Sequence, residues 1–131
     1  MSLQAQLQVA STEFQKLQAE MSNAVDARQR LGSQLTENEM VKKEFERLTP
    51  ENIVYKQIGP VLVKQDQSEA KSNVETRLEF IKGEIKRVEA QLKDIEERTE
   101  QKKSQLISIQ TAIQQSAPQG PAGSKQAVAA S

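Results

Sequence analysis

Apolar residues recur at helical spacing along the first third of the chain. From residue 3 to residue 35 the spacing alternates between four and three, which is the heptad period of a helix that packs through one stripe. We call such a stripe a seam. The members of this first seam are Leu3, Leu7, Ala10, Phe14, Leu17, Met21, Ala24, Arg28, Leu31 and Leu35. The pattern predicts a helix over about residues 3–48, with a change of register after residue 35. The apolar positions that suggest this change are Val41, Phe45 and Leu48.

A second seam with the same alternation lies in the other half of the chain. Its members are Val74, Leu78, Ile81, Ile85, Val88, Leu92, Ile95, Thr99, Lys102, Leu106, Ile109 and Ile113. Two capping pairs compete for the start of this helix, Asp66 with Glu69 and Ser72 with Glu75. Ala70 keeps the phase of the seam, which favours the earlier start and predicts a helix over about residues 67–115.

Two seams of similar length, joined by a short bend, predict an antiparallel pair of helices. Pairing them in reverse order places Arg28 opposite residues 94–95 and Lys102 opposite residues 20–21. Polar residues in a seam reduce stability but can set the register of the helices. We therefore expect an interhelical contact between Lys102 and Glu20.

The stretch between the helices, residues 49–66, has the composition of strands. Pro50 ends the first helix because proline lacks an N–H donor and clashes with the preceding turn. The β-branched and aromatic residues that follow surround a Gly59-Pro60 turn signal and predict a β-hairpin over about residues 53–65. An isolated hairpin is marginal in water and leaves two free edges, so this element implies partners. The alternative is a stiff loop that only reverses the chain.

Composition narrows the class of protein. The 131 residues include 18 basic and 18 acidic side chains and only 3% aromatic residues, too few for an ordinary globular core. The absence of a basic cluster argues against nucleic-acid binding, and no apolar run is long enough for a membrane span. Without Cys or His we expect no enzyme, no metal and no cofactor. A soluble intracellular protein is the default expectation, and residues 116–131, rich in Pro, Gly, Ala and Ser, are expected to be a disordered tail.

Some apolar residues lie outside both seams. Phe80 has two interpretations: it packs with Phe45 under the hairpin, or it is an isolated exposed aromatic residue. Val9 and Ile107 lie off the seams near the two helix ends, where fraying exposes an adaptable apolar surface.

The hairpin region resembles a known family. Residues 48–66, Leu-Thr-Pro-Glu-Asn-Ile-Val-Tyr-Lys-Gln-Ile-Gly-Pro-Val-Leu-Val-Lys-Gln-Asp, followed by Arg-Leu-Glu-Phe-Ile at 77–81, are similar to the β-type subunits of prefoldin. The resemblance covers about residues 5–113, within an expected domain of residues 1–115. The segments Val-Tyr-Lys and Ile-Gly-Pro-Val-Leu-Val-Lys-Gln-Asp are most similar to those of one eukaryotic subunit type.

The resemblance implies an ATP-independent co-chaperone, or holdase, in the cytoplasm. Prefoldin is a hexamer, so the implied partners are two α-type and three further β-type subunits, whose hairpins join in β-barrels. The helical arms hold unfolded clients such as actin and tubulin and deliver them to the cytosolic chaperonin TRiC/CCT. The residues implied in subunit assembly are Ile53, Val54, Tyr55, Ile58, Val61, Leu62 and Val63. Those implied in client contact are Leu3, Leu7, Val9, Phe14, Leu106, Ile107, Ile109 and Ile113. The alternative function is a structural coiled-coil adaptor or tether within a multisubunit complex.

Overall fold

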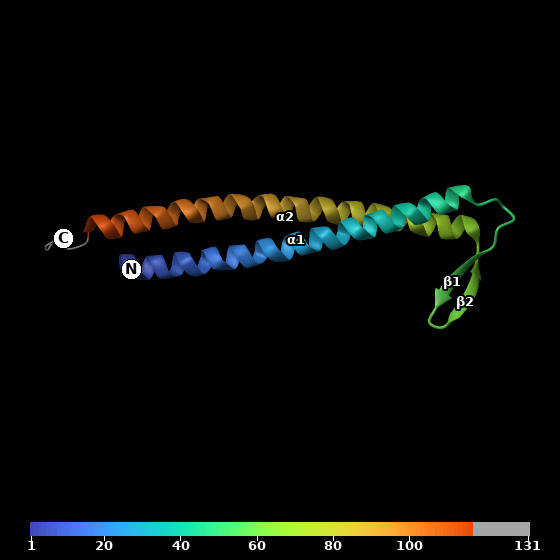
Figure 1. The fold of residues 1–131 in the computed structure, drawn as a ribbon, viewed down its shortest axis with the longest axis horizontal. Coiled ribbons are helices and arrows are strands. Elements are labelled where there is room, and N and C mark those ends of the chain that lie inside the picture. Colours follow the sequence, from blue (N-terminus) through green and yellow to red (C-terminus); the bar gives the residue numbers. More distant parts are fainter. Residues whose placement is uncertain (117–131) are drawn as a thin grey trace, which may run out of the picture. The chain divides into compact units, whose positions relative to one another are not determined.

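The computed structural model describes residues 1–116 as two long helices with one β-hairpin between them (Figure 1). Helix α1 spans Leu3–Arg47, strand β1 spans Val54–Ile58, strand β2 spans Val61–Gln65, and helix α2 spans Gln67–Ser116. This architecture confirms the predicted mainly helical fold with a hairpin between the helices. The tail expected at residues 116–131 lies outside the described residues, except that Ser116 closes α2. Among the described helices, none combines the length and apolar character that a membrane crossing requires.

The described residues form two compact units. The end unit contains residues 1–22 and 94–116, and the hairpin unit contains Asn23–Lys93 with both strands. Within each unit a segment of α1 packs against a segment of α2 that runs in the opposite direction. In the hairpin unit, Arg28 Nε lies 3.2 Å from Glu89 Oε2. In the end unit, Lys102 Nζ lies 2.7 Å from Glu13 Oε1.

Each unit has a thin core made of seam residues. In the hairpin unit the buried side chains are Ala24, Ala70, Val74, Leu78, Ile81, Ile85 and Val88. In the end unit they are Ala10, Leu17, Ile95 and Ile109. All of them occupy positions that the heptad pattern predicted for the contact between helices. Their burial in a single stripe is what removes apolar surface from water and holds each pair of helix segments together.

The predicted change of register after residue 35 is wrong. The spacing continues without interruption through Asn38, Lys42 and Phe45, all of which are half-buried, whereas Val41 is 43% exposed. A polar side chain is tolerated at such a position because it can pack its stem and keep its polar end in contact with water or a partner. Asn38 Oδ1, for example, accepts a hydrogen bond from Arg77 Nη1 at 3.4 Å. The heptad of α1 therefore keeps its phase and leaves Val41 outside the seam.

Local hydrogen bonds define both ends of the bend. After α1, the Thr49 N–H donates to Asn52 Oδ1 at 2.8 Å, and the Asn52 N–H donates to the Thr49 carbonyl at 3.0 Å. The Gln67 side-chain amide also donates to this carbonyl at 3.0 Å, which ties the turn to the start of α2. Asp66 caps α2, because its Oδ2 accepts the Glu69 N–H at 3.0 Å. The earlier of the two predicted helix starts is thus confirmed.

The strands pair as a tight antiparallel hairpin, which excludes the alternative of a plain reversing loop. Ile58 pairs with Val61 and Val54 with Gln65, so only Gly59 and Pro60 form the turn. Gly59 has a φ of +60° at the first central position, as a type II′ turn requires. This turn twists in the same sense as the strands and sets their register.

Gly83 is a position where the helix can be strengthened. It lies exposed within α2, and a Cβ added there meets nothing within 4 Å. We expect Gly83→Ala to raise the free energy of unfolding by about 1 kcal/mol, because alanine loses less backbone entropy in a helix. Denaturant unfolding of the purified chain measures this change. Gly59→Ala is the contrasting variant and is expected to destabilise the chain, since its positive φ strains any L side chain. A loss of stability in Gly83→Ala would contradict the prediction.

Candidate interaction surfaces

The hairpin presents apolar side chains to solvent. The predicted assembly residues form what we call the hairpin surface: Ile53, Val54, Tyr55, Ile58, Val61, Leu62 and Val63. All are exposed except Val54, which is half-buried. The sheet contains only two strands among the described residues, so the outer edge of each strand is unpaired there. Exposed apolar strands with free backbone groups are a template for pairing with another chain.

Both faces of the hairpin carry apolar residues. Partners in the register share a face and successive residues alternate between faces, so Ile58, Val61 and Val63 lie on one face. Tyr55 and Leu62 lie on the other. A hairpin that used only one face would be expected to carry polar residues on the second. Apolar residues on both faces suit a strand pair that is covered on both faces.

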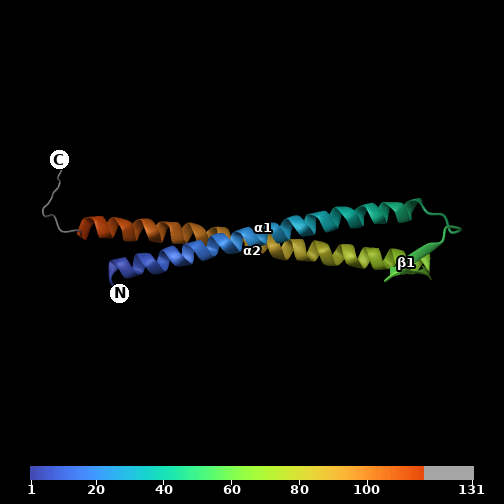
Figure 2. The same ribbon diagram turned by 60° about the horizontal axis from the view of Figure 1, so that its bottom comes forward.

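An open recess lies beside the hairpin and is lined by side chains of β1 and of the first turns of α2, among others. Figure 2 shows the backbone of this region, with β1 beside the start of α2. Its volume is about 730 Å³. Both helices and the hairpin contribute lining residues, among them Val41, Phe45, Tyr55 and Phe80. Phe80 is 67% exposed, yet it lines the same recess as Phe45. Each interpretation of Phe80 was therefore partly right, because it borders the hairpin but remains largely in water.

The predicted client-contact residues divide by exposure in the end unit. Ile109 is buried in the core, whereas Val9 and Ile107 are exposed at 45% and 63%. The remaining five are half-buried: Leu3, Leu7, Phe14, Leu106 and Ile113. Most of the set therefore packs between the helices, and the two residues outside the seams offer the largest apolar surface.

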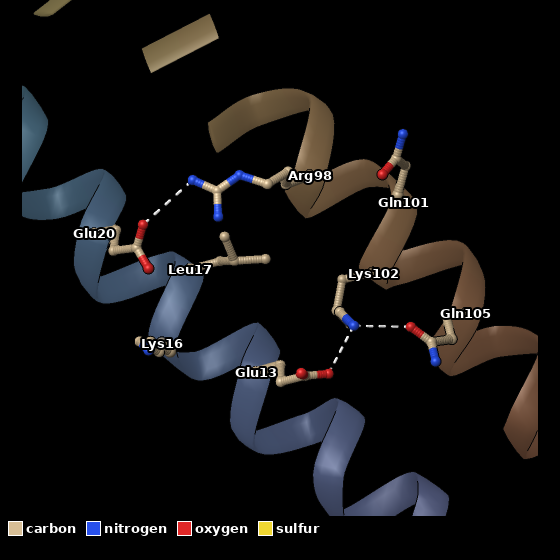
Figure 3. A pocket seen from close by; sticks show the side chains of 8 residues that line it. All are labelled: Glu13, Lys16, Leu17, Glu20, Arg98, Gln101, Lys102 and Gln105. Carbon is tan, nitrogen blue, oxygen red and sulfur yellow. Dashed lines mark hydrogen bonds and ion pairs between the residues drawn. The ribbon is translucent and has the colours of Figure 1, made fainter. Parts of the chain in front are cut away.

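Polar side chains flank the seam of the end unit (Figure 3). Lys102 Nζ lies 2.7 Å from Glu13 Oε1 and 2.9 Å from Gln105 Oε1, while Arg98 Nη2 lies 3.4 Å from Glu20 Oε1. The predicted contact between Lys102 and Glu20 is therefore wrong. Glu13 and Glu20 are seven residues apart, so a heptad pattern alone cannot choose between them.

The predicted position of Arg28 along α2 is also wrong, by five or six residues. Arg28 forms an ion pair with Glu89 rather than lying opposite residues 94–95.

Among the ion pairs within a single helix, Arg87 binds Glu84 at 2.8 Å and holds the pKa of that carboxyl below its usual value. Such solvated pairs contribute little to stability. Across residues 1–116, no three acidic, His or Cys side chains are grouped as metal ligands.

Comparison with known proteins identifies the family. A sequence model described as prefoldin subunit matches residues 8–112 of this chain. The chain belongs to the prefoldin subunit family. Prefoldin subunit 6 of Bos taurus is 44% identical over 112 residues, covering 86% of this chain and 87% of the relative. Prefoldin subunit 6 of Saccharomyces cerevisiae is 42% identical over 105 residues, covering 80% and 92%. The eukaryotic subunit type indicated by the hairpin segments is thus subunit 6.

A solved prefoldin structure has the same fold. The crystal structure of the prefoldin beta subunit from Thermococcus strain KS-1 superposes with a TM-score of 0.72 at 25% sequence identity. The match covers 82% of this chain and 91% of the Thermococcus chain. Membership of the prefoldin family places the chain among the components of a chaperone complex, whose other subunits are its partners.

One candidate interaction surface, the recess, was not predicted from the sequence. The recess depends on Val41, Lys56 and Arg77, which come from three different elements. The available signal was that Val41 and Phe80 both fall outside the heptad phase, one in each helix. An uninterrupted count of the first seam through residue 45 would have identified Val41 as exposed.

Proposed function

We propose that this chain is a subunit of an ATP-independent holdase in the cytoplasm. In this proposal it joins two α-type and three further β-type prefoldin subunits in a hexamer. The complex captures unfolded clients such as actin and tubulin and delivers them to the cytosolic chaperonin TRiC/CCT. The observation that carries the proposal is the hairpin surface, which is apolar on both faces and has free edges in a chain of this family.

The hairpin surface is proposed to assemble the complex. Backbone groups at the strand edges pair with hairpins of neighbouring subunits, and the apolar faces become the inside and outside of a shared β-barrel. The face that lines the barrel, which carries either Ile58 or Leu62, is buried in this way, and apolar surface that the chain alone leaves in water is removed.

The helix ends are proposed to hold clients. The end unit offers few exposed apolar side chains, with Val9 and Ile107 the largest among those predicted to bind clients. Each contact is weak, but several arms that act on one unfolded chain bind it strongly and still reversibly. No nucleotide is needed for such capture, because release follows from the weakness of each contact.

The experiment replaces Val9 and Ile107 together by serine in the assembled hexamer. We expect about fivefold weaker suppression of the aggregation of denatured actin, since losing each apolar contact costs a fraction of the binding free energy. Light scattering during dilution from denaturant measures the suppression. The matched control is Val25→Ser, another exposed valine of α1 that belongs to the hairpin unit. Unchanged suppression by the double variant in an intact hexamer would refute the proposed client contact.

The alternative is a structural adaptor or tether. It is favoured by one observation, that six of the eight predicted client-contact residues are wholly or partly buried between the helices. An adaptor binds a folded partner and has no affinity for unfolded chains. A holdase suppresses aggregation of several unrelated denatured proteins, whereas an adaptor suppresses none.

A further inference from the structure

The recess beside the hairpin is lined in part by apolar residues that the pairing of the two helices does not bury. Val41 and Phe80 lie outside the seams of α1 and α2, so packing between the helices does not account for either. Both nevertheless line the same recess, together with Tyr55 of β1. Side chains from three elements that converge in this way form a concave apolar site rather than scattered exposed residues.

The charge of the recess is of one sign. Lys56 and Arg77 are the only charged side chains that line it. Neither forms an ion pair within the described part of the chain, and Arg77 donates only to the neutral Asn38 Oδ1 at 3.4 Å. An occupant of complementary chemistry therefore carries an apolar side chain next to a carboxylate.

The position of the recess indicates where this occupant comes from. Val54, Tyr55 and Lys56 of β1 form one wall, so the recess is continuous with the hairpin surface. A chain that pairs with the outer edge of β1 passes over this wall and reaches Phe80. We infer that the recess receives an apolar segment flanked by a carboxylate from a neighbouring prefoldin subunit, and that this contact selects the neighbour. The inference rests on the proposed assembly role and assigns partner choice to residues outside the hairpin surface.

The hairpin surface and the recess differ in how well they can distinguish one partner from another. Edge pairing uses backbone groups, which every strand possesses, so it gives affinity with little discrimination. A concave site with an aromatic anchor and two cations rejects segments that lack the matching carboxylate, because a wrong partner leaves charges desolvated and unpaired. Discrimination among similar hairpins therefore belongs to the recess.

The test reconstitutes the hexamer from purified subunits, with variant and tagged wild-type chains competing for incorporation. Phe80→Ala and Arg77→Glu are each expected to reduce incorporation by about tenfold or more, as for an aromatic or charged residue at the centre of an interface. The matched controls are Met40→Ala and Lys71→Glu, which change exposed side chains that do not line the recess. The controls are expected to incorporate within about twofold of wild type. Circular dichroism verifies that each variant keeps its helices.

A photo-reactive phenylalanine analogue in place of Phe80 identifies the occupant directly. In the assembled hexamer we expect a crosslink to one other prefoldin subunit, at a segment that contains an acidic residue. A crosslink to the chaperonin or to a client, or variants that incorporate as well as their controls, would overturn the inference.

The proposed assembly role is tested separately by Leu62→Asp, which changes the hairpin surface and does not touch the recess. If Leu62→Asp blocks assembly and the recess variants do not, the inference fails and the assembly role stands. If Leu62→Asp also assembles normally, the assembly role itself is refuted.

Discussion

A chain carrying Gln57→Pro is expected to fold into its helices and to be excluded from the proposed prefoldin hexamer. Gln57 pairs with Leu62, one position beyond the Ile58–Val61 pair that closes the two-residue turn. Hydrogen-bonded and non-hydrogen-bonded pairs alternate along an antiparallel ladder. The pair next to a two-residue turn is hydrogen-bonded, so the Gln57 N–H points away from β2 and toward the free edge of β1.

Proline at residue 57 therefore spares the hairpin and removes a donor from its outer edge. Its ring also obstructs an approaching strand, which is why proline within sheets is confined to edges that pair with nothing. We expect the affinity for neighbouring subunits to fall at least about a hundredfold, corresponding to about 3 kcal/mol. Native mass spectrometry of the mixed subunits measures incorporation, and circular dichroism measures the retained helix.

The control for this variant is Gln57→Ala. It removes the side-chain amide, which donates to the Gly59 carbonyl at 3.3 Å, but keeps the backbone donor. We expect Gln57→Ala to assemble as wild type. Normal assembly of Gln57→Pro would show that the edge of β1 is not used, and Leu62→Pro would then test the edge of β2 in the same way.

Ile81→Ala is expected to destabilise the chain more than any exposed substitution in α2. Ile81 is only 3% exposed and lies in the seam of the hairpin unit. Replacing a buried isoleucine by alanine costs about 2–4 kcal/mol through lost apolar burial and the cavity left behind. A core one residue thick has no second layer that could close this cavity, so the loss is expected near the upper end. Thermal and denaturant unfolding measure it.

The neighbouring residue supplies the control. Phe80 has the larger side chain but is 67% exposed, so Phe80→Ala is expected to change the free energy of unfolding by less than about 0.5 kcal/mol. A similar loss of stability in both variants would mean that Phe80 packs within the chain. Such a result would also remove the case for its role at the recess.

The elements were predictable because their signals are local. Ala10, Leu17, Val74 and Ile81 repeat with the heptad, and their burial follows from that repeat alone. The cap at Asp66 and the glycine turn at Gly59 are equally local, since each depends on residues two or three positions away.

The contacts between elements were less predictable. A heptad is unchanged by a shift of seven residues, so the sequence could not decide whether Lys102 meets Glu13 or Glu20. The change of register was inferred from an apolar residue, Val41, that proved to lie outside the seam. Its exposure follows from its position outside the seam, and periodicity within one chain carries no information about what another chain covers.

The seam of α1 also implies a gradient of local stability within the hairpin unit. After Ala24 no residue of α1 is buried, and its last turns meet α2 through half-buried positions such as Asn38, Lys42 and Phe45. Local opening free energies follow the number of buried apolar contacts, so amide hydrogens in these turns are expected to exchange with solvent sooner than those of α2 around Ile81. The end of α1 is thus the less stable part of the hairpin unit, and a subunit that covered the recess as inferred above would stabilise it. If a neighbouring subunit covers Val41 and Phe45, its binding and the ordering of the last turns of α1 become a single cooperative event.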